Sequence, residues 1–372
     1  MENVVRNRLQ SVQFGTAQTY KNLTILPLIA PADGAFQYRT LGEALTQGDL
    51  VISEVSAGGS VPELLVVNRA HQAVLLIDGE ELAGAKQNRV LNTSILLKEG
   101  SETKIPVSCT EQGRWHYASR VFDVSGNVLA YKARSKKARA VHASLKARGA
   151  ACSDQGEVWD EISLLQAKAK AHSPTSAMSD VYKAWEEELH KCDEVFQLVP
   201  NQVGLFAMMD GQPAGMEFLS LSQAYAKLHA KLVRSYALEV LLDHDQPAKP
   251  AAPLPQPHPG DAPPAGAAPA APSNGDPTTV AKAFLETLLA AEEQRFPSIG
   301  HGAELRYRFA KPNSAKSVAN PPPAAGFALH SIAGSALVHQ DEVIHAAFFR
   351  LDDAEPPEQM ASYRHRRRWQ LE

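Results

Sequence analysis

The side chains best suited to chemistry are concentrated between residues 78 and 117. Carboxylates there can act as general acid and base, cationic side chains can clamp a phosphate, amides can read sugar hydroxyls, and an indole can stack on a base. This mixture suits a nucleotide or ADP-ribose-like ligand better than a hydrophobic one. We predict acid–base roles for Glu80, Glu81 and Glu111, and ligand-binding roles for Lys86, Gln87, Asn88, Arg89, Asn92, Arg114 and Trp115.

These side chains form one site only if the strands that carry them bring them together. In an antiparallel pair joined through Gly84 and Ala85, alternating residues of both strands project to the same side. Glu80 or Glu81 would then converge in one cleft with Arg89 and with Glu111 or Arg114. The alternative is a salt-bridged turn on an exposed sheet. The sequence contains neither a GxxxxGK[ST] nor a GxGxxG motif that would favour a phosphate site over this alternative.

Two further chemistries are weaker alternatives. Cys109 is a possible nucleophile assisted by Glu111 and His116, and its other interpretation is a packed thiol. A metal site built from His301, Glu304 and His345 lacks the HxxxH or HxH spacing that would support it, so we assign no metal ligands. The sequence leaves the cofactor open. The three cysteines of the chain show no zinc-like spacing and are expected to be reduced.

Charge and hydropathy limit the partners. The 372 residues include 37 basic and 41 acidic side chains, which argues against a whole surface adapted to nucleic acid or anionic membrane. Two basic segments, residues 131–150 and 364–368, are expected to be a solvated connector and a solvated end, with phosphate contact as the alternative. No apolar run approaches the length of a membrane span and no signal peptide is evident, so we expect a cytoplasmic protein.

Strand patterns come first and helix patterns follow, which predicts an α+β fold. Short apolar or β-branched runs separated by turns indicate a meander or a barrel-like sheet in the first half, and three- and four-residue apolar spacing indicates helices after residue 150. We expect strands at residues 23–29, 50–55, 63–67, 73–77, 89–97 and 104–109, and helices at residues 40–47, 155–171, 178–196 and 220–242.

Proline marks an insertion. Residues 246–277 hold 11 of the 25 prolines in the chain and only three charged residues, so this segment cannot offset its own ordering entropy. We predict a disordered Pro/Ala linker, with a docking motif as the alternative. Residues 278–352, a short αβ segment, would pack back on residues 1–245 to complete a single domain, and residues 353–372 would form a basic tail.

Several motifs resemble one bacterial protein family. The runs IDGEELAGAKQNRVLNTSILL and IPVSCTEQGRW, and then GHGAELRYRF with GSALVHQDEVIHAAFF, resemble the family named for its association with ADP-ribosylglycohydrolases and rhodanese-phosphatase-superfamily proteins. The resemblance implies a place in ADP-ribose or NAD-derived metabolism and fixes no mechanism. It supports two interpretations: an enzyme, most simply a hydrolase of ADP-ribose or a related nucleotide sugar, or a non-catalytic binding module or scaffold. The matching positions are Glu80, Glu81, Gly84, Lys86, Gln87, Asn88, Arg89, Asn92, Ser94, Cys109, Glu111, Arg114 and Trp115.

Overall fold

The computed structural model describes residues 1–56, 58–244, 275–310 and 331–351. Within these ranges the chain forms eight helices and 18 strands, which confirms the α+β class with a β-rich first half. Most of the predicted linker and the whole predicted basic tail, with its residues 364–368, lie outside the described residues.

The largest sheet joins segments from both ends of the chain. Its strands follow the order β1-β3-β13-β14-β18-β17-β16-β15, and β2 pairs with β3. Because β18 pairs with β14, the C-terminal segment packs back on the first part of the chain, as the sequence predicts. The domain limits themselves stay a prediction. The strands are β1 (Gln13–Phe14), β2 (Gln18–Tyr20), β3 (Leu23–Ile29), β13 (Gln202–Met209), β14 (Gln212–Leu219), β15 (Glu292–Pro297), β16 (Ala303–Ala310), β17 (Ser331–His339) and β18 (Glu342–Arg350).

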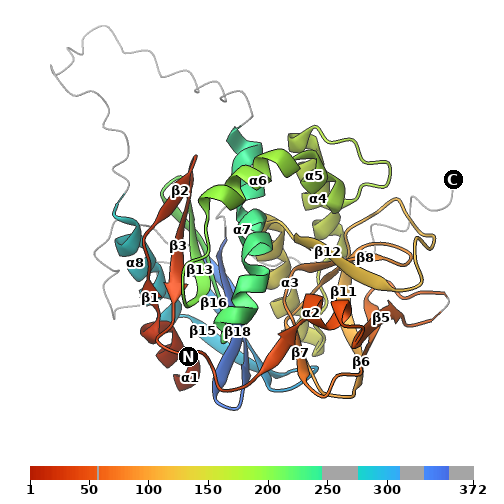
Figure 1. Cartoon of the computed structure of the whole chain (residues 1–372), viewed down its shortest axis with the longest axis horizontal. Helices are drawn as coiled ribbons and strands as arrows, with labels where there is room; N and C mark the ends of the chain where they lie inside the picture. Colours follow the sequence, from red (N-terminus) through yellow and green to blue (C-terminus); the bar gives the residue numbers. More distant parts are fainter. Residues whose placement is uncertain (57, 245–274, 311–330, 352–372) are drawn as a thin grey trace, which may run out of the picture.

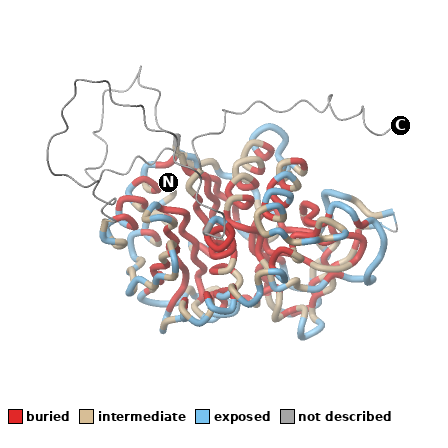
Figure 2. Tube along the Cα trace, turned by 90° about the horizontal axis from the view of Figure 1, so that it is seen from above, coloured by how far each residue is buried: buried red, intermediate tan, exposed pale blue. Residues whose placement is uncertain are grey.

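Helices cover both faces of this sheet, because its central strands are apolar on both sides. Along β13, Phe206 faces a core shared with α1 (Asn3–Ser11) and α8 (Pro277–Leu289), whereas its neighbour Leu205 faces a core shared with α7 (Ser222–His244). Figure 1 shows α8 beside β1 and α7 in the middle of the molecule. The buried residues follow these layers in Figure 2.

Two smaller sheets form the other half of the molecule. One has the order β12-β8-β9-β11-β6-β5, and contacts between its end strands, β12 and β5, show that it curls into a barrel-like form. The second has the order β10-β7-β4. The strands are β4 (Tyr38–Thr40), β5 (Leu50–Glu54), β6 (Glu63–Asn68), β7 (Ala73–Leu76), β8 (Glu80–Gly84), β9 (Arg89–Leu91), β10 (Ile95–Leu97), β11 (Glu102–Cys109) and β12 (Phe122–Val128).

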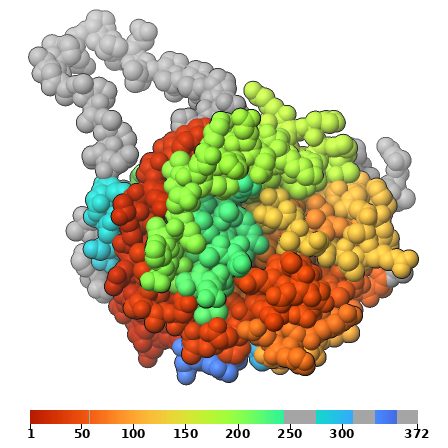
Figure 3. Space-filling model, in the orientation of Figure 1, coloured from red at the N-terminus to blue at the C-terminus, as the bar shows by residue number. Residues whose placement is uncertain are grey.

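One long helix contacts both halves of the molecule. α7 contacts both β13 of the large sheet and β12 of the barrel-like sheet. Figure 3 shows the green helical layer in front, with N-terminal residues in red and orange on both sides of it. The remaining helices are α2 (Leu41–Thr46), α3 (Tyr131–Arg148), α4 (Gln155–Ala169), α5 (Met178–Ala184) and α6 (Glu186–Val195).

Two predicted elements are each divided in the structure, and one hairpin was not predicted. The helix expected at residues 178–196 is two helices, α5 and α6. The strand expected at residues 89–97 is two strands, β9 and β10, which belong to different sheets. The chain turns between them because Asn92 and Thr93 bond away from the ladder, Asn92 to the carbonyl of Ala151 and Thr93 to Glu304. The hairpin of β13 and β14 was not predicted, although an Asp-Gly turn lies between two apolar runs there.

The basic segment at residues 131–150 is not a solvated connector. It forms α3, in which Arg134 and Lys137 are buried and bonded to Glu217 and Asp78. Buried and paired cations cannot contact the phosphates of a nucleic acid. Three further cations of α3 are paired with carboxylates of α4 and α7; they are Lys132, Lys136 and Arg139.

Candidate functional site

The register of three neighbouring strands separates the predicted site residues onto two faces. Arg89 of β9 lies opposite Leu82 of β8 and Cys109 of β11, so the Arg89 and Cys109 side chains leave the sheet on the same side. Glu81 lies opposite Val90 and projects to the other side. Of the two glutamates that the sequence offered for convergence with Arg89, Glu81 therefore lies on the opposite face.

The three predicted acid–base carboxylates are buried and bonded inside the protein. Glu80 forms an ion pair with Lys231 of α7, and Glu81 accepts a hydrogen bond of 2.7 Å from Thr110 Oγ1. Burial raises the pKa of Glu81 to about 7, although hydrogen bonds from neighbouring side chains oppose this. A carboxyl with such a pKa suits proton transfer, but its side chain has no exposed surface in this structure.

Glu111 and Arg114 hold the turn that follows β8. Arg114 donates to Glu111 Oε2 at 2.6 Å, to the Ala85 carbonyl at 2.6 Å and to Asn88 Oδ1 at 3.1 Å. Burial raises the pKa of Glu111, but Arg114 and the other donors outweigh it and leave the pKa below its usual value. Glu111, Asn88 and Arg114 therefore shape the backbone around residues 84–88, and their polar groups face one another.

Two further predicted residues have structural surroundings. The amide of Asn92 is bonded to Ala151 and to Ser108. Cys109 is 1% exposed, and burial raises the pKa of its thiol although the nearby Arg89 guanidinium opposes this. A thiol with a raised pKa is a poor nucleophile at neutral pH, so the geometry favours the packed-thiol interpretation of Cys109.

Arg89 has a different environment from these residues. Its side chain is fully buried, and Nη1 donates to Gln87 Oε1 at 2.8 Å. Nε and Nη2 have no hydrogen-bond partner among the described residues. The nearest carboxylate oxygen, Glu54 Oε1, lies 3.8 Å from Nη2, and Glu54 Oε2 also lacks a partner in the described part of the chain.

A half-exposed indole and a lysine lie close to Arg89. Trp115 and Tyr117 are each 48% exposed. Lys86 Nζ lies 5.3 Å from the Trp115 ring centroid and 5.2 Å from that of Tyr117, and Arg89 Cζ lies 5.6 Å from the Trp115 centroid. Lys86 also donates to the Gly58 carbonyl at 2.7 Å. Two cations thus lie beneath rings that reach the surface.

We call this group the Arg89 site: Glu54, Lys86, Gln87, Arg89, Trp115 and Tyr117. It contains four of the predicted ligand-binding residues and adds Glu54 and Tyr117, which the sequence did not single out. Glu54 ends β5 and precedes a Gly-Gly pair, and that pair was a usable signal for a close backbone approach. A Cβ placed on Gly59 would lie 3.2 to 3.4 Å from atoms of Lys86, Glu54 and Trp115, so this loop lies directly on the site.

A second buried polar group lies between the two halves of the molecule. Ser94 Oγ is 2.8 Å from His345 Nδ1, and His345 Nε2 is 3.0 Å from Glu217 Oε1. Both oxygens of Glu217 accept bonds from Arg134, at 2.7 and 2.8 Å. Burial raises the pKa of Glu217, but Arg134 and His345 outweigh it and lower the pKa to about 2. We call Ser94, Arg134, Glu217 and His345, with the Asp78–Lys137 ion pair, the Glu217 network.

The histidines considered for a metal do not meet. His345 belongs to the Glu217 network, whereas His301 bonds to Glu99, and Glu304 is bonded to Thr93 and Arg306. In the part of the chain that the structure describes, no three histidine, cysteine or carboxylate side chains are grouped to hold a metal ion. The described helices likewise include none with the length and apolar character that a membrane crossing requires.

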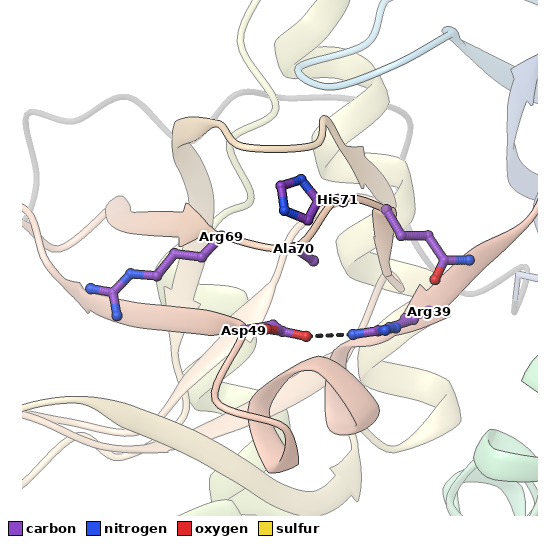
Figure 4. A pocket seen from close by; sticks show the side chains of 6 residues that line it. Arg39, Asp49, Arg69, Ala70 and His71 are labelled. Atoms are coloured by element: carbon purple, nitrogen blue, oxygen red, sulfur yellow. Dashed lines mark hydrogen bonds and ion pairs between the residues drawn. The ribbon is translucent and has the colours of Figure 1, made fainter.

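A surface hollow of about 440 Å³ lies away from these residues. Figure 4 shows Arg39 and Asp49 joined across it and Arg69 directed away from them. The hollow is open, and its described lining contributes no buried polar atom without a partner. Arg39 is already neutralised by Asp49. The Arg89 site is therefore the better candidate, because its cation is buried and incompletely bonded.

The fold and the site together describe an α+β protein in which a buried arginine lies under half-exposed rings at one end of a barrel-like sheet. Residues 11–349 match the family described as the ARG and Rhodanese-Phosphatase-superfamily-associated Protein domain. The chain belongs to this family, as its motifs indicate. No curated protein and no solved structure matches it.

Proposed function

We propose that the protein binds an ADP-ribose-type or related nucleotide ligand at the Arg89 site, and that it acts as a binding module. The observation that carries this proposal is the buried Arg89 guanidinium with two nitrogens lacking hydrogen-bond partners in the described residues. A buried cationic donor without a partner is costly, and a phosphate group supplies the acceptors and the charge that it lacks.

The rings suit the other part of such a ligand. A nucleotide base stacks on an aromatic side chain without needing a sequence-specific hydrogen bond. Trp115 lies next to both Lys86 and Arg89, so a base on the indole would place its phosphates near two cations. Because Arg89 has no exposed surface and lies beside the indole, we expect ligand entry to require the Trp115 ring to shift.

The carboxylates support binding ahead of hydrolysis. Glu80 and Glu111 are held by Lys231 and Arg114, and Glu81 projects from the opposite face of the sheet from Arg89. None of these three is positioned to exchange a proton with a ligand at Arg89. A hydrolase of ADP-ribose or a related nucleotide sugar is therefore the second candidate, favoured only by the Glu81 pKa of about 7.

Thermal unfolding of the full chain with ADP-ribose, NAD and inorganic pyrophosphate tests the proposal, combined with chromatography of the nucleotides after incubation. We expect ADP-ribose to raise the Tm of wild type with no new product. Arg89→Met should lower the affinity roughly 100-fold, because it removes charge-assisted hydrogen bonds. Arg69→Ala, in the surface hollow, is the matched control and should bind as wild type.

Two results would count against the proposal. Equal stabilisation of wild type and Arg89→Met would place the ligand elsewhere. A product that forms with wild type and is lost in Glu81→Gln would identify a hydrolase.

A further inference from the structure

Among the residues that the structure describes, Glu54 is the carboxylate of the Arg89 site. It is the last residue of β5, and its side chain is 3% exposed. Oε1 accepts the backbone N–H of Lys86 at 3.4 Å and lies 3.8 Å from Arg89 Nη2. That separation is too long for a hydrogen bond, so the pair is not a tight salt bridge.

The other oxygen of Glu54 lacks a donor. Oε2 is buried and has no hydrogen-bond partner within the described residues. An added Cβ at Gly59 would lie 3.4 Å from this oxygen and 3.4 Å from Trp115 Cζ2, so the oxygen and the ring border the same small space. A buried carboxylate oxygen needs a hydrogen-bond donor, and Lys86 and Arg89 beside it favour a neutral donor over a further cation.

We infer that Glu54 accepts a hydrogen bond from a ribose hydroxyl of the ligand, which makes the Arg89 site selective for ribonucleotides over deoxyribonucleotides. This inference rests on the proposed function. With the base on Trp115 and a phosphate on Arg89, the sugar lies between them, and an acidic side chain is a common acceptor for ribose hydroxyls in nucleotide sites. Glu54 thus reads the sugar, whereas Arg89 reads the phosphate.

An exocyclic amine of the base offers the same donor chemistry, and the choice of ligands separates the two sources. ADP, 2′-deoxy-ADP, 3′-deoxy-ADP and inosine diphosphate are titrated calorimetrically into the full-length wild type, Glu54→Gln and Glu54→Ala. Glu63→Gln, an exposed carboxylate on the neighbouring strand β6, is the control. Inorganic pyrophosphate, which has no sugar, reports the phosphate contact alone.

We expect wild type and Glu63→Gln to bind ADP at least roughly tenfold more tightly than one of the deoxy analogues, since hydrogen bonds to charged groups contribute on this scale. Glu54→Ala should reduce this affinity ratio to near one, and Glu54→Gln should give a ratio between those of Glu54→Ala and wild type. Pyrophosphate should bind both Glu54 variants at least as tightly as wild type, because a negative charge beside Arg89 is gone. A merely structural role for Glu54 would instead weaken every ligand together.

The outcomes distinguish this inference from the proposed function. If wild type binds ADP through Arg89 but binds both deoxy analogues equally well, the role of Glu54 is wrong and the binding site stands. A loss confined to inosine diphosphate would assign the donor to the base amine and would also overturn the inference. Failure of ADP itself to bind would overturn both.

Discussion

The Arg89 site and the Glu217 network each bury an arginine near a glutamate, but they differ in how completely the charges are bonded. Arg134 reaches both oxygens of Glu217 at 2.7 and 2.8 Å, and Ser94 and His345 extend the chain of bonds. Arg89 lies 3.8 Å from Glu54, and two of its nitrogens have no hydrogen-bond partner in the described residues.

This difference distinguishes an arginine with a structural role from one that can bind a ligand. The closely bonded Arg134–Glu217 pair joins α3 to β14 of the large sheet, and Nε is the one nitrogen of Arg134 without a hydrogen-bond partner in the described residues. Arg89 is already desolvated but makes only part of its hydrogen bonds, so a ligand that supplies acceptors can form the bonds that the fold leaves unmade. Ser94, His345 and Glu217 are ordered like a nucleophile relay, yet the bidentate contact of Glu217 with Arg134 fits a structural role between the halves of the molecule.

The largest expected effect is on stability. Arg134→Met should lower the free energy of unfolding by about 3–5 kcal/mol, because it leaves the buried Glu217 without its cation. Arg89→Met should cost no more than about 1 kcal/mol, since it also removes an incompletely paired buried charge. Urea unfolding of both variants at one pH measures the two values. Equal losses would contradict the difference between the two arginines.

Glu81 and Glu217 have pKa values shifted in opposite directions, so they should contribute to the pH dependence of stability with opposite signs. The pKa of Glu81 is about 7 in the folded protein, above its usual value near 4.5, so its contribution is present below about pH 4.5 and is lost as the pH rises through 7. Glu81→Gln should therefore raise the stability at pH 8 by about 3 kcal/mol and flatten the slope between pH 5 and 7.

Glu217 has the reverse behaviour. Its pKa of about 2 lies below the usual 4.5, so its contribution is present above about pH 4.5 and is lost as the pH falls through 2. Glu217→Gln should therefore be less stable than wild type near neutral pH, and most of this difference should disappear in acid. Unfolding curves across pH test both residues, and a Glu81→Gln protein whose stability still falls between pH 5 and 7 would contradict the assigned pKa.

The rim of the Arg89 site should affect affinity more than stability. Trp115→Ala removes a half-exposed ring, so we expect a loss of about 1 kcal/mol or less in unfolding free energy. Its affinity for ADP should fall roughly tenfold or more through lost stacking. Unchanged ADP binding by Trp115→Ala would show that the base lies elsewhere.

The sequence predicted the fold class and located four of the six Arg89-site residues, because alternating apolar runs and dense polar residues are local signals. It could not decide which of Glu80 and Glu81 shares a face with Arg89, since that depends on the strand register, in which Glu81 lies opposite Val90. Nor could it place Glu54 at the site. Glu54 lies on β5, and only the curling of the barrel-like sheet brings it near β9.

The burial of Arg134 and Lys137 could likewise not be predicted from the sequence. A basic helix without acidic residues is usually solvated, and here its acidic partners, Glu217 and Asp78, lie 83 and 59 residues away in the chain. The tertiary fold supplies the compensating charges, which local sequence cannot show.

The most direct test of the central claim is a crystal structure of the full chain with ADP-ribose. We predict a phosphate oxygen about 2.8 Å from Nε or Nη2 of Arg89, with the Trp115 ring shifted and stacked on the base. A diphosphate bound elsewhere, for example between Arg39 and Arg69 in the surface hollow, with Arg89 still lacking a partner, would contradict it.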